Sequence, residues 1–148
     1  MFYIALIFLS PPTYSYCFKE AGKMYNVDSV LLEAIATQES SLNAAAVNEN
    51  KNKDGKVISK DYGLMQINSE WFGKLSDFDV NESTVMEPCF NVHLGAWVLS
   101  SNFSTHGYNW NSVGAYNAGF KKSKQKLRDI YIKRIKRIYY RLKQRNNL

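Results

Sequence analysis

The sequence predicts one mostly helical α+β domain, and three observations support this prediction. Its 148 residues are enough for a single domain with one hydrophobic core. Apolar residues recur at helical spacing in several segments, which indicates amphipathic helices. One polar, alternating stretch surrounds Asp54-Gly55, a dipeptide typical of hairpin turns. The composition, 45% hydrophobic and 14% aromatic, argues against a disordered chain.

The N-terminal half is expected to form two helices and a small hairpin. The helices cover residues 17–26 and 29–41, and Asp28 is placed to cap the second one ahead of its apolar face. Residues 47–63, around the hairpin-turn dipeptide, form a small β-hairpin or a long loop.

The C-terminal half is expected to be helical throughout. Pro88 suits the first turn of a helix over residues 88–103, and a short helix over 110–120 is stopped by Gly119. Residues 121–126 are a candidate flexible joint before the last helix. An apolar stripe marks that helix: Leu127, Tyr131, Ile135, Ile138 and Leu142.

Residues 1–15 have the character of a secretory signal peptide. The run MFYIALIFLS is apolar but too short to cross a bilayer as a helix. Cleavage after Ser15 would place Thr13 and Ser15 at the small-residue positions, although no Lys or Arg precedes the apolar run. An uncleaved anchor or a buried N-terminal segment is the alternative. A signal peptide predicts a mature protein in the periplasm.

The chain has two cysteines, Cys17 and Cys89. Export would place both in an oxidising compartment, so we expect them to form a disulfide. Two buried free thiols are the alternative if the protein stays in the cytosol.

Charge divides the chain into an acidic body, residues 16–120, and a basic C-terminal segment, residues 121–148. From Lys121 onward the sequence has 12 of its 19 basic residues and one of its 13 acidic residues, Asp129. This segment is either an amphipathic helix packed on the body, a contact to anionic membrane or peptidoglycan, or a docking surface for another protein. Nucleic acid is a poor partner for an exported protein.

Glu39 is the candidate general acid. It follows Leu32 by seven residues and Ile35 by four, so it shares the buried face of its helix, whereas Glu33 points away. Burial among apolar side chains raises the pKa of a carboxyl and keeps it protonated near neutral pH. A protonated acid is what cleavage of a glycosidic bond requires. The alternative is an ordinary solvated or capping glutamate at a helix end.

Four motifs, in this order, resemble the soluble lytic transglycosylase family: ATQESSLNAAAVN, DYGLMQIN, EPCFNVHLGAW and VGAYNAGF. The resemblance covers roughly Cys17 to Phe120 and implies a lysozyme-like fold, with residues 16–120 as the catalytic domain. More narrowly, the chain is similar to the small transglycosylases that accompany type III secretion systems.

The resemblance also implies a reaction and a set of site residues. Glu39 would be the catalytic acid that cleaves the bond between N-acetylmuramic acid and N-acetylglucosamine in peptidoglycan, closing a 1,6-anhydro ring. Substrate-binding roles fall on Ser40, Met65, Gln66, Tyr116 and Asn117. From the residues alone, Met65 also fits a core position and Tyr116 a packing position. Asn91 and Gly95 match family positions that look structural.

Asp61 departs from the one-carboxylate scheme of many lytic transglycosylases. The segment KDYGLMQINSEWF resembles animal c-type lysozymes, which have an aspartate before the corresponding Tyr-Gly, facing the catalytic glutamate. A second carboxylate at this place would stabilise or capture the oxocarbenium-like sugar. Alternatively, Asp61 caps the turn or pairs with Lys60 or Lys53.

Metal sites are not predicted. Asn50, Asn52 and Asp54, with Asp61 at the twelfth position, mimic an EF-hand loop, but they carry little negative charge for Ca²⁺. The histidines, His93 and His106, have no ligand-like spacing and fit surface or packing positions. We therefore expect no metal and no organic cofactor.

Three functions remain open from the sequence. The favoured one is a lytic transglycosylase that opens the wall locally for a secretion apparatus, acting as a monomer on peptidoglycan with an apparatus protein as partner. The second is a hydrolytic muramidase that uses Glu39, Asp61 and water. The third, a weakly catalytic wall-binding assembly module, ranks last because Glu39, Gln66 and Tyr116 are all present.

Overall fold

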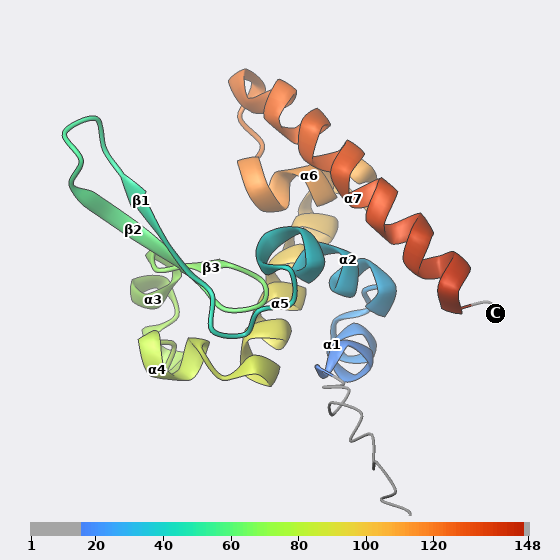
Figure 1. The fold of residues 1–148 in the computed structure, drawn as a ribbon, viewed down its shortest axis with the longest axis horizontal. Helices are drawn as coiled ribbons and strands as arrows, with labels where there is room; N and C mark the ends of the chain where they lie inside the picture. Colours follow the sequence, from blue (N-terminus) through green and yellow to red (C-terminus); the bar gives the residue numbers. More distant parts are fainter. Residues whose placement is uncertain (1–15, 147–148) are drawn as a thin grey trace, which may run out of the picture.

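The structure is a computed structural model that describes residues 16–146, so the expected signal peptide lies outside the described residues. It confirms a mostly helical α+β fold with a small antiparallel sheet (Figure 1). The α-helices are α1 (Phe18–Tyr25), α2 (Ser29–Ser40), α3 (Glu70–Lys74), α4 (Glu82–Val85), α5 (Pro88–His106), α6 (Trp110–Ala118) and α7 (Gln125–Asn146). The strands are β1 (Val47–Lys51), β2 (Val57–Tyr62) and β3 (Ile67–Asn68), and the 3₁₀ helices are η1 (Ser76–Phe78) and η2 (Lys122–Lys124).

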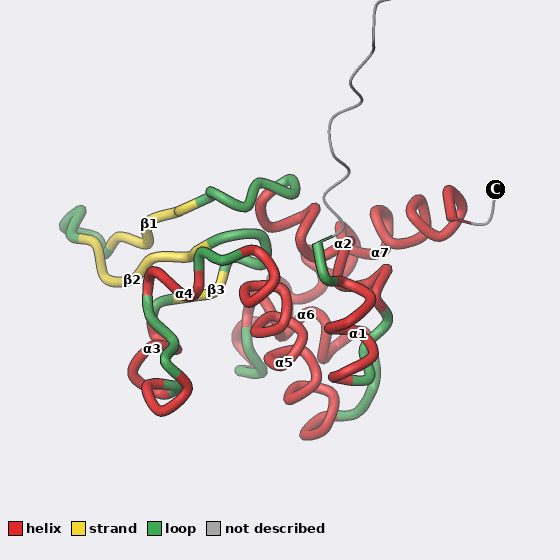
Figure 2. Tube along the Cα trace, turned by 90° about the horizontal axis from the view of Figure 1, so that it is seen from below, coloured by secondary structure: helices red, strands yellow, loops and turns green. Residues whose placement is uncertain are grey.

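The molecule has a sheet lobe at one end and a helical lobe at the other. The β1–β2 hairpin projects from the body in Figure 1, and α7 runs along the opposite edge. The sheet has the order β1-β2-β3 and pairs antiparallel throughout. Figure 2 shows the three strands beside α3 and α4, with the other helices gathered away from them. The hairpin predicted around Asp54-Gly55 is confirmed.

The core lies mainly among α2, α5 and the turn between β2 and β3. Leu32 and Ile35 of α2 are fully buried, as their helical spacing predicted. Asp28 caps α2 as expected, because its Oδ1 accepts a hydrogen bond from the Val30 N–H at 2.9 Å. Ser41, in the left-handed conformation, ends the helix immediately after the Glu39-Ser40 pair. The cap and this stop fix the position of Glu39 in the last turn of α2.

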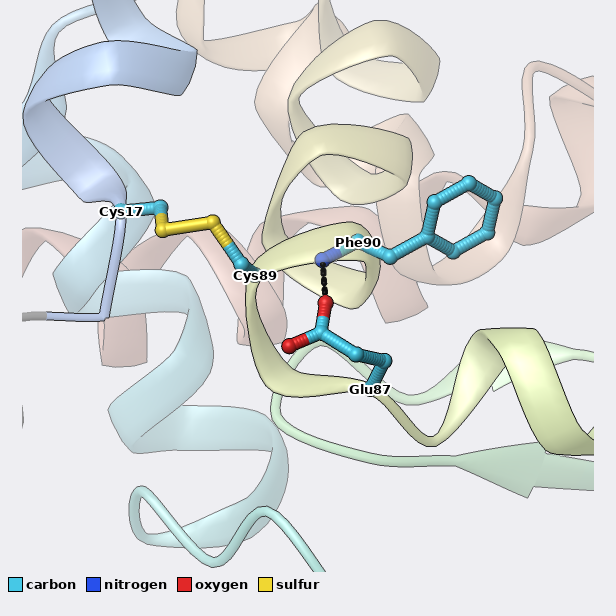
Figure 3. The surroundings of a disulfide bond; sticks show 4 residues. All are labelled: Cys17, Glu87, Cys89 and Phe90. Carbon is cyan, nitrogen blue, oxygen red and sulfur yellow. Dashed lines mark hydrogen bonds between the residues drawn. A yellow bond between two sulfur atoms is a disulfide. The ribbon is translucent and has the colours of Figure 1, made fainter.

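The start of α5 is anchored covalently and by a cap (Figure 3). Pro88 is at its first turn, and the Glu87 side chain accepts a hydrogen bond from the Phe90 N–H at 2.6 Å. The predicted disulfide between Cys17 and Cys89 is present, with 5.4 Å between the Cα atoms. It joins residues 72 positions apart, a closure worth roughly 4 kcal/mol in the chain-entropy model. The bond holds the beginning of α1 against α5.

Helix α7 packs on the body through α2 and α6. Tyr131, Ile135 and Leu142 of the predicted stripe are buried, but Leu127 is 48% exposed. Arg128 takes the inner position at this end of the helix, and its guanidinium donates to the carbonyls of Gly119 and Lys121 at 2.7 and 3.0 Å.

The segment expected to be a flexible joint, residues 121–126, instead forms the 3₁₀ helix η2 and the start of α7. Arg128 explains the difference, because its bonds tie this connection to the end of α6. Within residues 16–146, no helix combines the length and the apolar character needed to cross a membrane.

Candidate active site

A cleft of about 560 Å³ separates the sheet from the helices. Its lining joins residues that are far apart in the sequence but share one cavity: Glu39, Asn48, Asn50, Ser59, Asp61, Gln66, Ile67, Asn68, Trp71, Val98, Tyr116 and Asn117. Glu39 enters from the end of α2, and Asp61 enters from β2. The structure therefore brings both predicted carboxylates to the same cavity.

Glu39 lies in the helical wall and bonds to Tyr131 of α7. The Tyr131 hydroxyl donates to Oε1 of Glu39 at 2.5 Å. Burial raises the pKa of Glu39 to about 7, although this hydrogen bond opposes the rise, and the negative charge of Asp61 adds to it. A carboxyl with this pKa is still partly protonated at neutral pH, and it can donate a proton and take one back near that pH.

Asp61 is held by amide groups from both neighbouring strands. The side-chain amides of Asn50 and Asn68 each donate to one of its carboxylate oxygens at 2.8 Å. Asn68 lies directly opposite Asp61 in the β2–β3 pairing. Both amides also donate to the Ser59 hydroxyl at 3.1 Å. The strand register thus fixes the orientation of the Asp61 carboxylate at the cleft.

The lysine pairings considered for Asp61 are absent from the described residues. The Lys60 Nζ instead lies 3.7 Å from Oε1 of Glu49. The EF-hand alternative does not fit either, because residues 50–61 form two paired strands and not a loop wound around an ion. Within residues 16–146 there is no group of three or more His, Cys, Asp or Glu side chains that could hold a metal.

The turn between β2 and β3 is fastened from below by Asn91 of α5. Its fully buried amide donates to the carbonyls of Tyr62 and Val85 at 2.8 Å and accepts from the Met65 N–H at 2.7 Å. Gly63 has φ of 72°, and a Cβ there would lie 2.4 Å from the Asn91 amide nitrogen. Only glycine fits this approach. Asn91 therefore has the structural role that the motifs suggested.

Met65 and Ser40 were expected to contact the sugar, but in the structure they lie behind the cleft lining. Met65 is fully buried and packs against Gly95, where a Cβ would meet its side chain at 2.7 Å. The Ser40 hydroxyl donates to the Leu64 carbonyl at 2.9 Å, joining the end of α2 to the turn. Neither lines the cavity, because the tight turn directs Met65 into the core and the Leu64 carbonyl engages Ser40.

Gln66, Tyr116 and Asn117 do line the cleft. The Gln66 amide donates to the Gly63 carbonyl at 2.9 Å, and its oxygen accepts from Asn48 at 2.6 Å. The Tyr116 hydroxyl donates to the Met65 carbonyl at 2.8 Å. Burial, with the negative charges of Glu39 and Asp61, raises the pKa of Tyr116 well above its usual value. It remains a neutral donor.

A sequence model of the Transglycosylase SLT domain matches residues 16–139. The chain belongs to the transglycosylase SLT family. It is a peptidoglycan lytic transglycosylase, as the four motifs implied. The match continues past Phe120, where those motifs end, and takes in most of α7.

Relatives of similar size resemble this transglycosylase over most of its length. Invasion protein IagB of Salmonella typhimurium is 41% identical over 128 residues, which cover 86% of this chain and 77% of that protein. Protein IpgF of Shigella flexneri is 40% identical over 141 residues, covering 95% and 90%. A peptidoglycan-binding-like protein of Escherichia coli O157:H7 is 38% identical over 136 residues, covering 90% and 81%.

Two solved structures share the fold. An inactive mutant of lytic transglycosylase Slt from Pseudomonas aeruginosa superposes with a TM-score of 0.65 at 20% identity, covering 93% of this transglycosylase. A 70-kDa soluble lytic transglycosylase in complex with bulgecin A gives 0.65 at 23% identity, covering 90%. The transglycosylase spans about a quarter of each of those chains, 25% in both cases.

Sequence reasoning missed the three residues whose side chains donate hydrogen bonds to the two carboxylates of the transglycosylase site. Tyr131 was assigned only to the apolar stripe, yet its hydroxyl reaches Glu39. The signal was the hydroxyl itself, because a buried tyrosine usually needs a hydrogen-bond partner. Asn50 was considered only as a metal ligand and Asn68 not at all, whereas both donate to Asp61. The two asparagines flank Asp61 only once β1 and β3 pair with β2, so the sequence alone gives no sign of their role.

The histidines of the transglycosylase have packing partners. His93 packs edge-to-face against Tyr25 with 5.9 Å between ring centroids. His106 stacks on Phe120 with 3.5 Å between centroids. Neither lines the cleft.

Proposed function

We propose that this enzyme cleaves the β-1,4 bond between N-acetylmuramic acid and N-acetylglucosamine and leaves a 1,6-anhydro end. The observation that carries the proposal is Glu39, whose carboxyl faces the cleft with its pKa raised to about 7 by burial. A group with this pKa can serve as acid in one step and base in the next at neutral pH. The proposal needs no cofactor.

The first step is protonation of the leaving group. The Glu39 carboxyl donates its proton to the glycosidic oxygen, the bond from that oxygen to C1 of the muramyl sugar breaks, and N-acetylglucosamine leaves as an alcohol. The muramyl sugar becomes oxocarbenium-like, and Glu39 becomes a carboxylate. The Tyr131 hydroxyl, which bonds Oε1, stabilises this newly formed charge.

The second step closes the ring. The Glu39 carboxylate removes the proton of the C6 hydroxyl, and O6 bonds to C1 of the same sugar. No water is consumed in this step, and Glu39 is protonated again for the next turnover. Asp61, oriented by Asn50 and Asn68, supplies negative charge toward the cationic sugar between these steps.

Hydrolysis is the second candidate, and the position of Asp61 favours it. Asp61 lines the same cleft as Glu39 and is held by two amide donors, an arrangement suited to a carboxylate that captures or stabilises C1. Water would then take the place of the C6 hydroxyl, and the product would have a reducing end. The assembly-module alternative ranks last, because an intact Glu39 site is unnecessary for scaffolding.

We propose that the enzyme acts in the periplasm as a monomer and opens the wall for a secretion apparatus. The similarity to a protein named for invasion, IagB, supports a role in such a system. An apparatus protein would recruit it to the site of assembly. The disulfide between Cys17 and Cys89 fits an oxidising compartment.

Digestion of isolated peptidoglycan tests the proposed chemistry. The released muropeptides are analysed by mass spectrometry for the wild-type enzyme, Glu39→Gln and Glu33→Gln. Glu33 is the matched control because it lies on the same helix outside the cleft and pairs with Arg145. We expect products one water lighter than reducing fragments from the wild type and Glu33→Gln, and at most traces of them from Glu39→Gln. Reducing products would establish the hydrolytic alternative, and full activity of folded Glu39→Gln would overturn both.

A further inference from the structure

Helix α7 has two faces with different surroundings. Its inner face, with Tyr131, Ile135 and Leu142, is buried against α2 and α6. Its other face is open to solvent along the full 22 residues. Exposed basic residues occupy that outer face: Lys126, Lys133, Arg134, Arg137 and Arg141. We call these five residues the basic face of α7.

The basic face has no acidic partner within residues 16–146. Ion pairs of α7 occur near its C-terminal end, where Lys143 and Arg145 meet Asp28 and Glu33 of the body at 2.9 Å. The helix has one acidic residue, Asp129, whose carboxylate accepts a hydrogen bond from Gln125 at 2.8 Å. The charges that hold α7 to the body are thus separate from those of the basic face. Within the described residues, the charges of the basic face form no ion pair.

Two exposed apolar side chains lie among the basic residues. Ile130 is 43% exposed and Tyr140 is 54% exposed on this side of α7. Basic residues alternating with apolar ones are typical of helices that lie in a membrane interface, where the charges meet headgroups and the apolar groups enter the acyl boundary. A hydrated polysaccharide could meet the charges, but it has no acyl region into which Ile130 would insert.

The position of α7 suits a flat partner. It runs as one continuous helix along an edge of the molecule (Figure 1), and 22 residues extend about 33 Å. None of the described residues that line the cleft belongs to α7. A surface bound along the outer side of α7 therefore leaves the cleft lining uncovered.

We propose that the basic face of α7 docks this enzyme on the anionic lipid surface of a membrane. Each Lys or Arg near such a surface strengthens binding by about 1 kcal/mol, which corresponds to roughly fivefold in the partition constant. The acidic body, with 12 of the 13 acidic residues, is repelled by the same surface. The charge distribution thus orients the molecule with α7 toward the lipid. Docking does not depend on the proposed chemistry, so either can fail alone.

Vesicle co-sedimentation of the full chain tests the docking. The vesicles contain either phosphatidylcholine alone or phosphatidylcholine with 30% phosphatidylglycerol. The test variant is Lys133→Gln/Arg137→Gln/Arg141→Gln, and the matched control is Lys23→Gln/Lys53→Gln/Lys56→Gln, which removes equal charge from exposed sites of the body. All three proteins share residues 1–15, so any lipid binding by that segment is common to them. Circular dichroism and the thermal midpoint check that each variant is folded.

We expect the wild type and the control to prefer the anionic vesicles and the α7 variant to lose roughly a hundredfold in partition. Raising the salt from 0.05 to 0.5 M should release the wild type, because screening weakens exposed charges. Equal binding of all three proteins, or no preference of the wild type for anionic vesicles, would overturn the proposal. A further outcome would also overturn it: the wild type and the control bind isolated peptidoglycan but not vesicles, and the α7 variant binds neither. The partner of the basic face would then be the wall.

Discussion

The two walls of the cleft treat the same chemical group in opposite ways. On the helical side, Glu39 is half-buried beside Tyr131 of α7, and the loss of solvation raises its pKa to about 7. On the sheet side, Asp61 receives one amide N–H on each carboxylate oxygen. Loss of solvation favours the protonated form of Glu39, whereas the two amide donors fix the orientation of Asp61 toward the cleft. Environment, and not residue type, therefore divides the two roles.

Glu39→Gln should have the largest effect on the contrast between the two walls of the cleft. The amide keeps the shape of the side chain but cannot donate the required proton, so we expect the rate of wall cleavage to fall by about 10²–10⁴-fold. The decrease in turbidity of a peptidoglycan suspension measures this loss. A folded Glu39→Gln protein with more than a tenth of the wild-type rate would remove Glu39 from the chemistry.

The same substitution should make the protein more stable at high pH. The pKa of Glu39 rises from 4.5 to about 7 on folding, so its contribution to stability is full below pH 4.5 and is lost as pH rises through about 7. The free energy of unfolding of the wild type minus that of Glu39→Gln should therefore be about 3 kcal/mol lower above pH 7 than at pH 4. Urea unfolding of both proteins from pH 4 to 8 measures the difference. A constant difference would show that the pKa of Glu39 is not raised.

Tyr131→Phe sharpens the comparison from the helical side. In the wild type, the hydrogen bond from the Tyr131 hydroxyl favours the charged form of Glu39 and lowers its pKa. Without this bond the pKa of Glu39 should rise further, and the basic limb of the pH–rate profile should move to higher pH. The rate should fall by about 10- to 100-fold, because a hydrogen bond to a charged group contributes about 1.5–3 kcal/mol. Tyr139→Phe is the matched control, since its hydroxyl donates to Asp28 outside the cleft. An unmoved profile would limit Tyr131 to packing.

Asp61→Asn tests the sheet side and should have the smallest effect. It removes the negative charge that raises the pKa of Glu39, so the basic limb should move to lower pH, opposite to Tyr131→Phe. The rate should fall several-fold, since we assign Asp61 an assisting role. Asp54→Asn, at the hairpin tip, is the control. A loss as large as that of Glu39→Gln would make Asp61 an essential partner and favour hydrolysis.

Local sequence predicted the helical wall better than the sheet wall. Glu39 follows Leu32 and Ile35 at fixed helical intervals, so its place on the inward face of α2 could be predicted from one segment. The partners of Asp61 depend on strand register. Asn68 lies opposite Asp61 in one pairing, and Asn50 reaches it from the other strand next to a register shift. Such pairings are tertiary and have no signal in a single segment.

Long-range contacts explain the other differences. Tyr131 meets Glu39 across 92 residues, and nothing near Tyr131 in the sequence indicates a catalytic neighbour. Met65 belongs to a motif expected at the cleft, but the turn held by Asn91 directs its side chain into the core. The signal peptide and its cleavage after Ser15 remain predictions, because residues 1–15 lie outside the described part of the chain.

A direct titration of Glu39 is the decisive measurement. The protein is labelled with ¹³C at the glutamate side-chain carboxyl, and the Glu39 resonance is assigned as the one missing from Glu39→Gln. We predict that its chemical shift titrates with a midpoint near 7, in keeping with a half-buried acid beside Tyr131. A midpoint near the ordinary glutamate value of 4.5 would contradict the account, because Glu39 would then be a carboxylate at neutral pH with no proton to give.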